Sequence, residues 1–267
     1  MSLLVANVVP FARTSRVDTG ALRAHLLWLL GSGGEGLAPL ADEFLWLDPE
    51  EKEQIITLCC DVGTGKPVLP CIWAPSPGQV ARLAKHAEAS GAMGVILPPP
   101  LLHTLQPEAL MSWYRTAAMA VHIPIFAWMH PAFGNDLSPT MLERLSGEIG
   151  IAGFLDSFGD AFRVRRLAKQ FPGRAWLGDD GLAGELRGTH GLAGLVSKAA
   201  NVWPEMASRL WRGKEELGEA WRARSQALTR AGDVAATKHI LRMGVRPPFT
   251  EVDSEQMEKL PNAGFMT

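Results

Sequence analysis

The sequence predicts an α/β protein: a (β/α)₈ barrel, also called a TIM barrel, followed by a short helical appendage at the C-terminus. Short apolar segments alternate with longer amphipathic ones up to about residue 213, which is the pattern of repeated strand–helix units. The apolar segments are continuous rather than alternating, as expected of parallel strands that are buried on both faces. The length of 267 residues is within the usual range of one such barrel.

Eight apolar segments qualify as barrel strands, and eight in series favour a closed barrel over an open sheet. They cover residues 3–9, 37–40, 67–72, 94–97, 123–128, 151–155, 175–177 and 191–197.

The segments between these strands have helical patterns. Leu22, Leu26 and Leu30 recur at helical spacing in the first of them. Asp48 and Pro49 fit the N-cap and the first position of the second. The predicted barrel helices cover residues 19–30, 49–59, 77–90, 106–120, 138–146, 160–171, 180–187 and 204–213.

The strand pattern ends after about Lys214. Residues 215–230, 234–242 and 253–260 are predicted to be helical, and two consecutive prolines, Pro247 and Pro248, interrupt them. We therefore expect two parts, a barrel over residues 1–213 and a helical segment over residues 214–267.

The composition excludes several classes of protein. The net charge of -2 and the isoelectric point of about 6.4 provide no basic surface for nucleic acid or for an anionic membrane. Residues 1–10 are apolar without a basic region before them, so they predict neither a signal peptide nor a membrane span. Cys59, Cys60 and Cys71 are odd in number and two are adjacent, so we expect reduced thiols in a cytoplasmic protein.

No motif predicts a metal or a cofactor. The seven histidines form no HxxxH or HExxH pair, and the cysteines lack zinc-site spacing. The glycine-rich residues 31–36 follow a helix and precede a strand, which is the wrong order for a phosphate-binding loop. Residues 63–66 resemble the end of a Walker A motif, but Pro67 follows the lysine and the first glycine is missing.

Several short motifs stand at the ends of predicted strands. Residues 43–51 combine a glutamate, a leucine four positions on and an acidic helix start, and residues 98–100 are three prolines. Residues 153–157 read Gly-Phe-Leu-Asp-Ser, residues 178–180 read Gly-Asp-Asp, and residues 201–204 read Asn-Val-Trp-Pro. In this order and spacing they resemble the motifs of the dihydrodipicolinate synthase / N-acetylneuraminate lyase family. The chain is identified as a divergent member of that family, over the barrel part of its length.

The resemblance implies a reaction whose residues this chain lacks. In the family, a lysine at the end of the sixth strand forms a Schiff base with pyruvate or another 2-keto acid, and a tyrosine at the end of the fifth strand moves the proton. Here Leu155 stands at the lysine position and Trp128 at the tyrosine position. Leucine has no nucleophile, and an indole N–H only donates. We therefore do not expect the family's lyase or aldolase reaction.

The other positions that the resemblance assigns to the proton relay and to a substrate carboxylate are also apolar. Leu40 and Ala41 stand where the family has two threonines, unless that pair is deleted, and Phe133 falls at the arginine position. These changes lie at the end of the barrel that carries active sites, so we expect an apolar pocket for a small ligand, of which a keto acid is one candidate. Its expected lining is Leu40, Ala41, Leu101, Leu102, Trp128, Phe133 and Leu155. The resemblance further implies a homo-oligomer, either a dimer or a tetramer.

Two alternatives stay open. Lys198 is the one lysine at the C-terminal end of a predicted strand, which makes it a candidate for a relocated Schiff-base lysine. Its alternative role is structural, with the ammonium group at the rim or paired with Asp179 or Asp180. The second alternative is a lysine-free proton-transfer enzyme that uses His130. The rim carboxylates available to it are Asp42, Glu43, Asp179 and Asp180.

Overall fold

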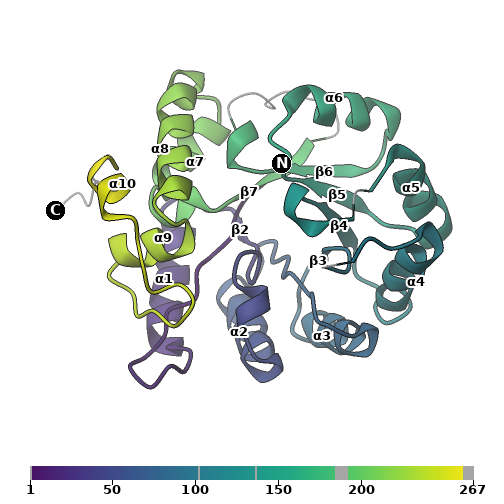
Figure 1. Ribbon diagram of the computed structural model, residues 1–267, viewed down its shortest axis with the longest axis horizontal. Helices are drawn as coiled ribbons and strands as arrows, with labels where there is room; N and C mark the ends of the chain where they lie inside the picture. Colours follow the sequence, from purple (N-terminus) through teal and green to yellow (C-terminus); the bar gives the residue numbers. More distant parts are fainter. Residues whose placement is uncertain (1, 102, 136, 184–191, 261–267) are drawn as a thin grey trace.

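A computed structural model describes residues 2–101, 103–135, 137–183 and 192–260, and it shows a curled parallel sheet with helices around it (Figure 1). The strand order is β2-β1-β7-β6-β5-β4-β3, and every pairing is parallel. The strands are β1 Ser2–Val5, β2 Gly36–Leu37, β3 Val95–Leu97, β4 Ile125–Met129, β5 Gly153–Asp156, β6 Ala175–Gly178 and β7 Leu192–Ser197.

Residues 67–72 close the ring between β2 and β3, at the third predicted strand position. The backbone N–H of Leu69 donates to the carbonyl of Leu37 at 2.9 Å, and that of Ile96 donates to the carbonyl of Pro70 at 2.9 Å. The prolines Pro67 and Pro70 have no N–H, so this segment forms isolated bridges instead of a continuous ladder. The predicted (β/α)₈ barrel is confirmed, and β5 and β7 occupy its sixth and eighth positions.

The helices begin close to the predicted residues. The backbone N–H of Asp48 donates to Oε2 of Glu51 at 3.0 Å, which forms half of a capping box ahead of Pro49. The barrel helices are α1 Thr19–Gly31, α2 Pro49–Val62, α3 Pro77–Ala89, α4 Pro107–Ala118, α5 Pro139–Arg144, α6 Ala161–Gln170 and α7 Pro204–Trp211. The helix predicted over 180–187 starts as a 3₁₀ turn at Asp180–Leu182, and its last four residues lie outside the described residues.

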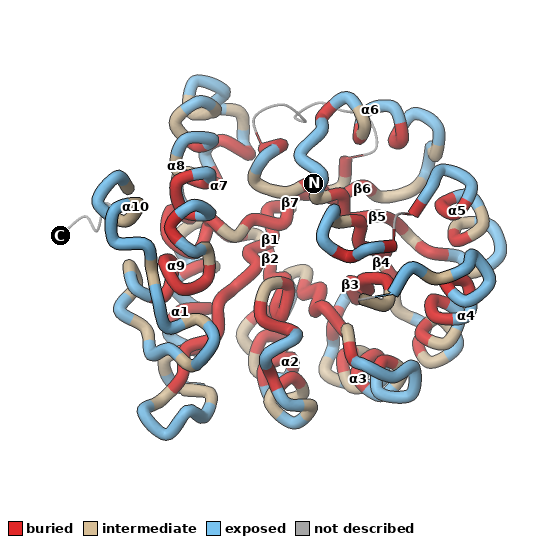
Figure 2. Tube along the Cα trace, in the orientation of Figure 1, coloured by how far each residue is buried: buried red, intermediate tan, exposed pale blue. Residues whose placement is uncertain are grey.

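Three further helices follow the barrel: α8 Gly218–Arg230, α9 Val234–Ile240 and α10 Ser254–Glu258. Figure 1 shows α8 beside α7, with α9 at the foot of α8. Trp221 and Leu228 of α8 are each 1% exposed and belong to the same apolar core as the barrel residues. The C-terminal segment therefore shares its hydrophobic core with the barrel. The strands of the barrel are largely coloured as buried in Figure 2.

Within the described part of the chain, no helix has the length and apolar character that crossing a membrane requires.

Candidate functional site

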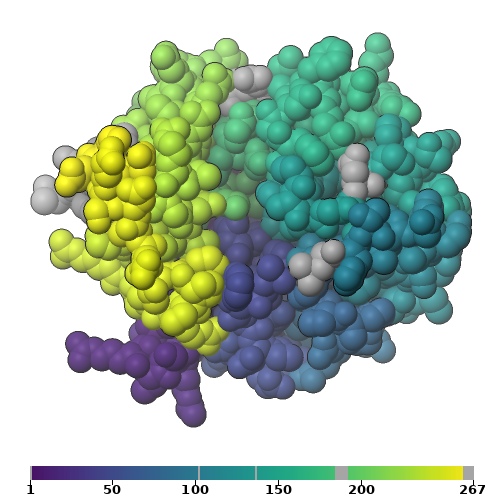
Figure 3. Space-filling model, in the orientation of Figure 1, coloured from purple at the N-terminus to yellow at the C-terminus, as the bar shows by residue number. Residues whose placement is uncertain are grey.

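A cavity of about 470 Å³ lies at the C-terminal ends of the strands, where barrels of this kind carry their sites. Trp128 of β4, Leu155 of β5 and Val196 of β7 form its apolar wall. The side facing them comes from α8 and the residue Asp233 that follows it. In Figure 3 the surface is recessed between the green C-terminal helices and the teal part of the barrel. The C-terminal segment thus supplies one wall of the site.

The apolar residues predicted to line a pocket separate into two groups. Ala41, Trp128 and Leu155 do line the cavity. Leu40 is buried in the core with a left-handed φ of 69°, and Phe133 packs behind Trp128 with ring centroids 5.0 Å apart. Neither of these two, nor the half-buried Leu101, belongs to the cavity lining. Leu102 lies outside the described residues.

Polar side chains also line the cavity. Its lining includes Ser157, Asp179, Lys198, Thr229 and Asp233. Two of these come from the C-terminal segment, which the strand pattern does not connect to the barrel's C-terminal end. The cavity therefore combines an apolar wall with a polar rim.

Leu155 and Trp128 are neighbours across the β4–β5 pairing. Leu155 is 1% exposed, so its side chain packs into the wall and offers only carbon to the cavity. The indole N–H of Trp128 donates to Oγ of Ser157 at 2.9 Å. The tryptophan therefore fixes a neighbouring hydroxyl group.

Lys198 is held by two carboxylates. Its Nζ lies 2.5 Å from Oδ1 of Asp42 and 3.3 Å from Oδ2 of Asp233. Burial opposes the charge, but the two carboxylates prevail and raise the pKa of Lys198 above its ordinary value. The sequence pointed to Asp179 or Asp180 as the ion-pair partners, and the structure corrects this to Asp42 and Asp233. Asp233 could not be found from sequence because no strand or motif precedes it.

Asp180 anchors the end of β7. Its carboxylate accepts hydrogen bonds from Oγ of Ser197 at 2.5 Å and from the backbone N–H groups of Lys198 and Ala199 at 2.8 and 2.9 Å. These donors occupy the carboxylate, so its role is to shape the loop. Asp156 is similarly engaged, since Nε of Arg163 donates to it at 2.9 Å.

Asp179 is more open to the cavity. Its Oδ1 accepts the backbone N–H of Gly181 at 3.0 Å. Burial raises the pKa of Asp179 to about 6, against the lowering effects of that hydrogen bond and of the Lys198 charge. Asp179 is thus a carboxylate that changes charge just below neutral pH.

His130 lies at the end of β4 against an aromatic cluster. Its ring centroid is 6.1 Å from that of Trp128 and 5.0 Å from that of Phe133. Its Nδ1 accepts the backbone N–H of Ala132 at 3.0 Å. Burial, and then the charge of Lys198, lower the pKa of His130, so the ring is neutral at pH 7.

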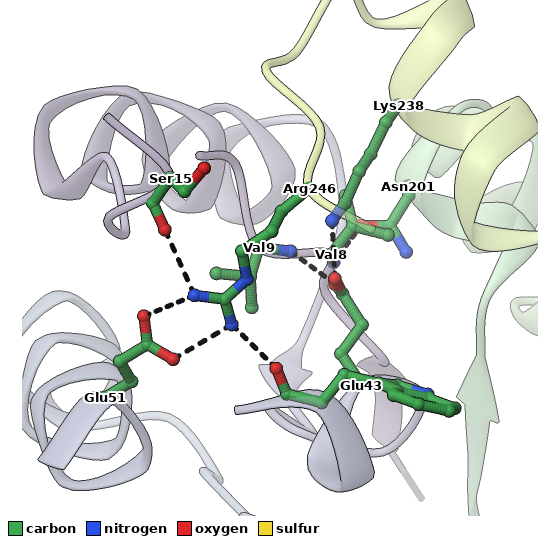
Figure 4. A network of polar contacts seen from close by, with 9 residues as sticks. Val8, Val9, Ser15, Glu43, Glu51, Asn201, Lys238 and Arg246 are labelled. Carbon is green, nitrogen blue, oxygen red and sulfur yellow. Dashed lines mark hydrogen bonds and ion pairs between the residues drawn. The ribbon is translucent and has the colours of Figure 1, made fainter. Parts of the chain in front are cut away.

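A second network ties the C-terminal segment to the first strands of the barrel (Figure 4). Lys238 of α9 forms a buried ion pair with Glu43, whose other oxygen accepts the backbone N–H of Val9 at 2.7 Å. Arg246 donates to both oxygens of Glu51 at 2.6 and 2.9 Å. Glu43 is therefore occupied structurally and does not act with His130 in the cavity.

Among the residues that the structure describes, no three His, Cys, Asp or Glu side chains are grouped in a way that could hold a metal ion.

The fold and the cavity define a (β/α)₈ barrel with a site at the C-terminal ends of its strands. The model of the Dihydrodipicolinate synthetase family matches residues 1–263, and the chain belongs to this family. An uncharacterized DapA-like lyase of Halobacterium salinarum is 33% identical over 227 residues, covering 83% of this chain and 74% of that protein. A 4-hydroxy-tetrahydrodipicolinate synthase of Nitrobacter hamburgensis is 31% identical over 214 residues, covering 77% of this chain and 71% of that protein.

Solved structures agree on the fold. The 4-hydroxy-tetrahydrodipicolinate synthase of Methylacidiphilum fumariolicum SolV has a TM-score of 0.88 at 23% identity, covering 98% of this chain and 94% of that one. The N-acetylneuraminate lyase of Mycoplasma synoviae has a TM-score of 0.87 at 19% identity, covering 99% of this chain and 95% of that one.

Proposed function

We propose that this protein binds a small molecule in the cavity at the C-terminal end of its barrel and does not run a Schiff-base lyase or aldolase reaction. The observation that carries the proposal is Leu155, which forms the cavity wall at the position where the family resemblance expects the lysine. An alkyl side chain cannot form the carbinolamine with which Schiff-base chemistry begins.

The ion pairs of Lys198 support the same proposal. An amine attacks a carbonyl only in its unprotonated form, and enzymes lower the pKa of such a lysine by burying it without a counter-charge. Asp42 and Asp233 have the opposite effect on Lys198. Its side chain is partly open, with 37% exposed. We therefore assign Lys198 a structural role at the cavity rim.

The test is reduction with sodium borohydride in the presence of pyruvate, followed by intact-mass measurement. We expect no mass increase. A lysine-bearing relative treated in parallel confirms that the conditions trap an imine. An adduct on this protein that peptide mapping places on Lys198, and that the Lys198→Met variant loses, would overturn the proposal.

Binding itself is tested by thermal shift with a panel of small carbonyl compounds and alcohols. Thr229 lines the cavity from α8 and is exposed, so Thr229→Trp fills the space without disturbing the core. We expect the stabilising compounds to lose their effect on this variant. Stabilisation that persists in Thr229→Trp would place the binding elsewhere.

We also propose that the protein is a homo-oligomer. Leu45 and Trp46 are apolar and 46% and 49% exposed, and Trp46 packs edge-on against Phe249 at 6.0 Å. Exposed aromatic surface of this kind is typical of subunit contacts. Light scattering after size exclusion should give a mass above 28.9 kDa, and Trp46→Glu should lower it. A monomer across the whole concentration range would contradict this.

A further inference from the structure

His130 presents a hydrogen-bond donor to the cavity that it lines. Since its Nδ1 accepts the N–H of Ala132, that nitrogen carries no proton, and the neutral ring must carry its proton on Nε2. Among the described residues, Nε2 has no hydrogen-bond partner in the protein. In this tautomer His130 donates through Nε2 and cannot accept a proton there.

Ser157 presents a second donor. An indole N–H can only donate, so the Trp128–Ser157 hydrogen bond makes Oγ of Ser157 the acceptor. The hydroxyl proton of Ser157 is then directed elsewhere. No other residue in the described part of the chain accepts it, and Ser157 lines the cavity. The tryptophan at the tyrosine position thus orients an O–H group toward a ligand.

Asp179 presents an acceptor at the same cavity. The backbone N–H of Gly181 occupies its Oδ1, and Oδ2 has no donor within the ranges that the structure describes. His130, Ser157 and Asp179 all line the same cavity. Two donors and one acceptor therefore face the same space.

The charge around the cavity disfavours an anion. The ammonium group of Lys198 is shared by two carboxylates, so that cluster is already negative. Asp179 and Asp180 add two more carboxyl groups to the lining, against one further cation among the residues that the structure describes, Arg230 on the exposed end of α8. A ligand carboxylate would be repelled at short range. An ammonium ligand, which has no acceptor atom, would leave both donors unsatisfied.

We infer that the cavity recognises an uncharged hydroxycarbonyl compound, whose carbonyl oxygen accepts hydrogen bonds from His130 and Ser157 and whose hydroxyl group donates to Asp179. The inference rests on the proposed binding function and names its ligand class. A volume of about 470 Å³ is within the size range of small-molecule sites.

Hydroxyacetone and pyruvate are a matched pair of probes, because they share the methyl ketone and differ in a hydroxymethyl group against a carboxylate. We expect hydroxyacetone to bind in a ligand-detected NMR titration at pH 7.5, and pyruvate to bind at least tenfold more weakly. Propane-1,2-diol lacks the carbonyl and should also bind more weakly. Equal or tighter binding of pyruvate, or no binding of hydroxyacetone, would overturn the inference.

The donors are tested by His130→Phe, which keeps the ring packing on Trp128, and by Ser157→Ala. Each should weaken hydroxyacetone binding about five- to tenfold, the usual effect of losing one hydrogen bond. His122→Phe is the matched control, since the His122 side chain is 98% exposed and outside the cavity lining. Unchanged affinity in His130→Phe would contradict the assignment.

The proposed function and the proposed ligand class can be refuted independently. A borohydride-trapped pyruvate adduct would refute the proposed function. Pyruvate binding without an adduct would leave the proposed function intact and refute only the ligand class.

Discussion

Glu43 and Lys238 form an ion pair that is almost completely buried, with side-chain exposures of 3% and 0%. They are 195 residues apart and join the loop after β2 to α9. The residue before Glu43, Asp42, binds Lys198. Two consecutive acidic residues thus hold the end of β7 and the C-terminal segment against the loop that follows β2.

Breaking the Glu43–Lys238 pair should destabilise the protein. Lys238→Met leaves the Glu43 carboxylate buried without its counter-charge, which costs about 3–5 kcal/mol. Denaturant unfolding followed by circular dichroism measures the change. The double variant Glu43→Gln/Lys238→Met should recover most of the lost stability, because the amide oxygen of the glutamine still accepts the N–H of Val9. Lys259→Met, at an exposed pair with Glu255, is the control and should have little effect.

Leu155→Lys should place a nucleophile at the position where the family resemblance implies one. The new ammonium group would lie in an apolar wall beside Trp128 and Leu177, so burial should lower its pKa and cost about 3 kcal/mol or more of folding free energy. A low pKa favours imine formation, and we expect a borohydride-trapped hydroxyacetone adduct at residue 155. Leu155→Met is the size-matched control. An unreactive Leu155→Lys that folds would show that the ketone does not reach residue 155.

Lys198 should react slowly with amine reagents. Two carboxylates hold it protonated, so its labelling by acetic anhydride at pH 8 should lag behind that of the exposed Lys259 in the same digest. Asp233→Asn removes one carboxylate and should speed the labelling by about tenfold for each unit by which the pKa falls. Equal rates for Lys198 and Lys259 in the native protein would mean that the ion pairs do not persist in solution.

Asp179 should make stability depend on pH. Its folded pKa of about 6 lies above the ordinary value of 3.8, so the folded state binds this proton more tightly than the unfolded state does. The contribution of this protonation to folding stability is fully present below about pH 4, and it is lost as the pH rises through 6. Asp179→Asn, whose amide oxygen can still accept the N–H of Gly181, should therefore be more stable than the native protein at pH 8, by about 1–3 kcal/mol. The free energies of unfolding of the two proteins should converge near pH 4. A difference between them that stays constant with pH would contradict the raised pKa.

The order of apolar and amphipathic segments determined most of the fold. Strands β4 to β7 lie within a few residues of their predicted positions, because parallel strands buried on both faces must be apolar throughout. Asp48 and Pro49 identified the start of α2, because the capping of its first N–H groups also depends only on neighbouring residues. The segment over 67–72 was less regular than predicted, since Pro67 and Pro70 cannot donate to a ladder.

The chemistry of the site depended on contacts that no local pattern contains. Leu155 and Trp128 could be placed at the end of the barrel from their positions in strands, and this located the apolar wall of the cavity. The ion-pair partners of Lys198 could not be found in this way, because Asp42 and Asp233 lie 156 and 35 residues away in sequence. Asp42 reaches Lys198 from the loop after β2, and Asp233 reaches it from the segment after α8. The sequence by itself predicted the barrel and placed a leucine where the family resemblance implies a lysine. Only the tertiary structure decided which polar groups of the rim meet one another, because hydrogen bonds and ion pairs are set by distance in space.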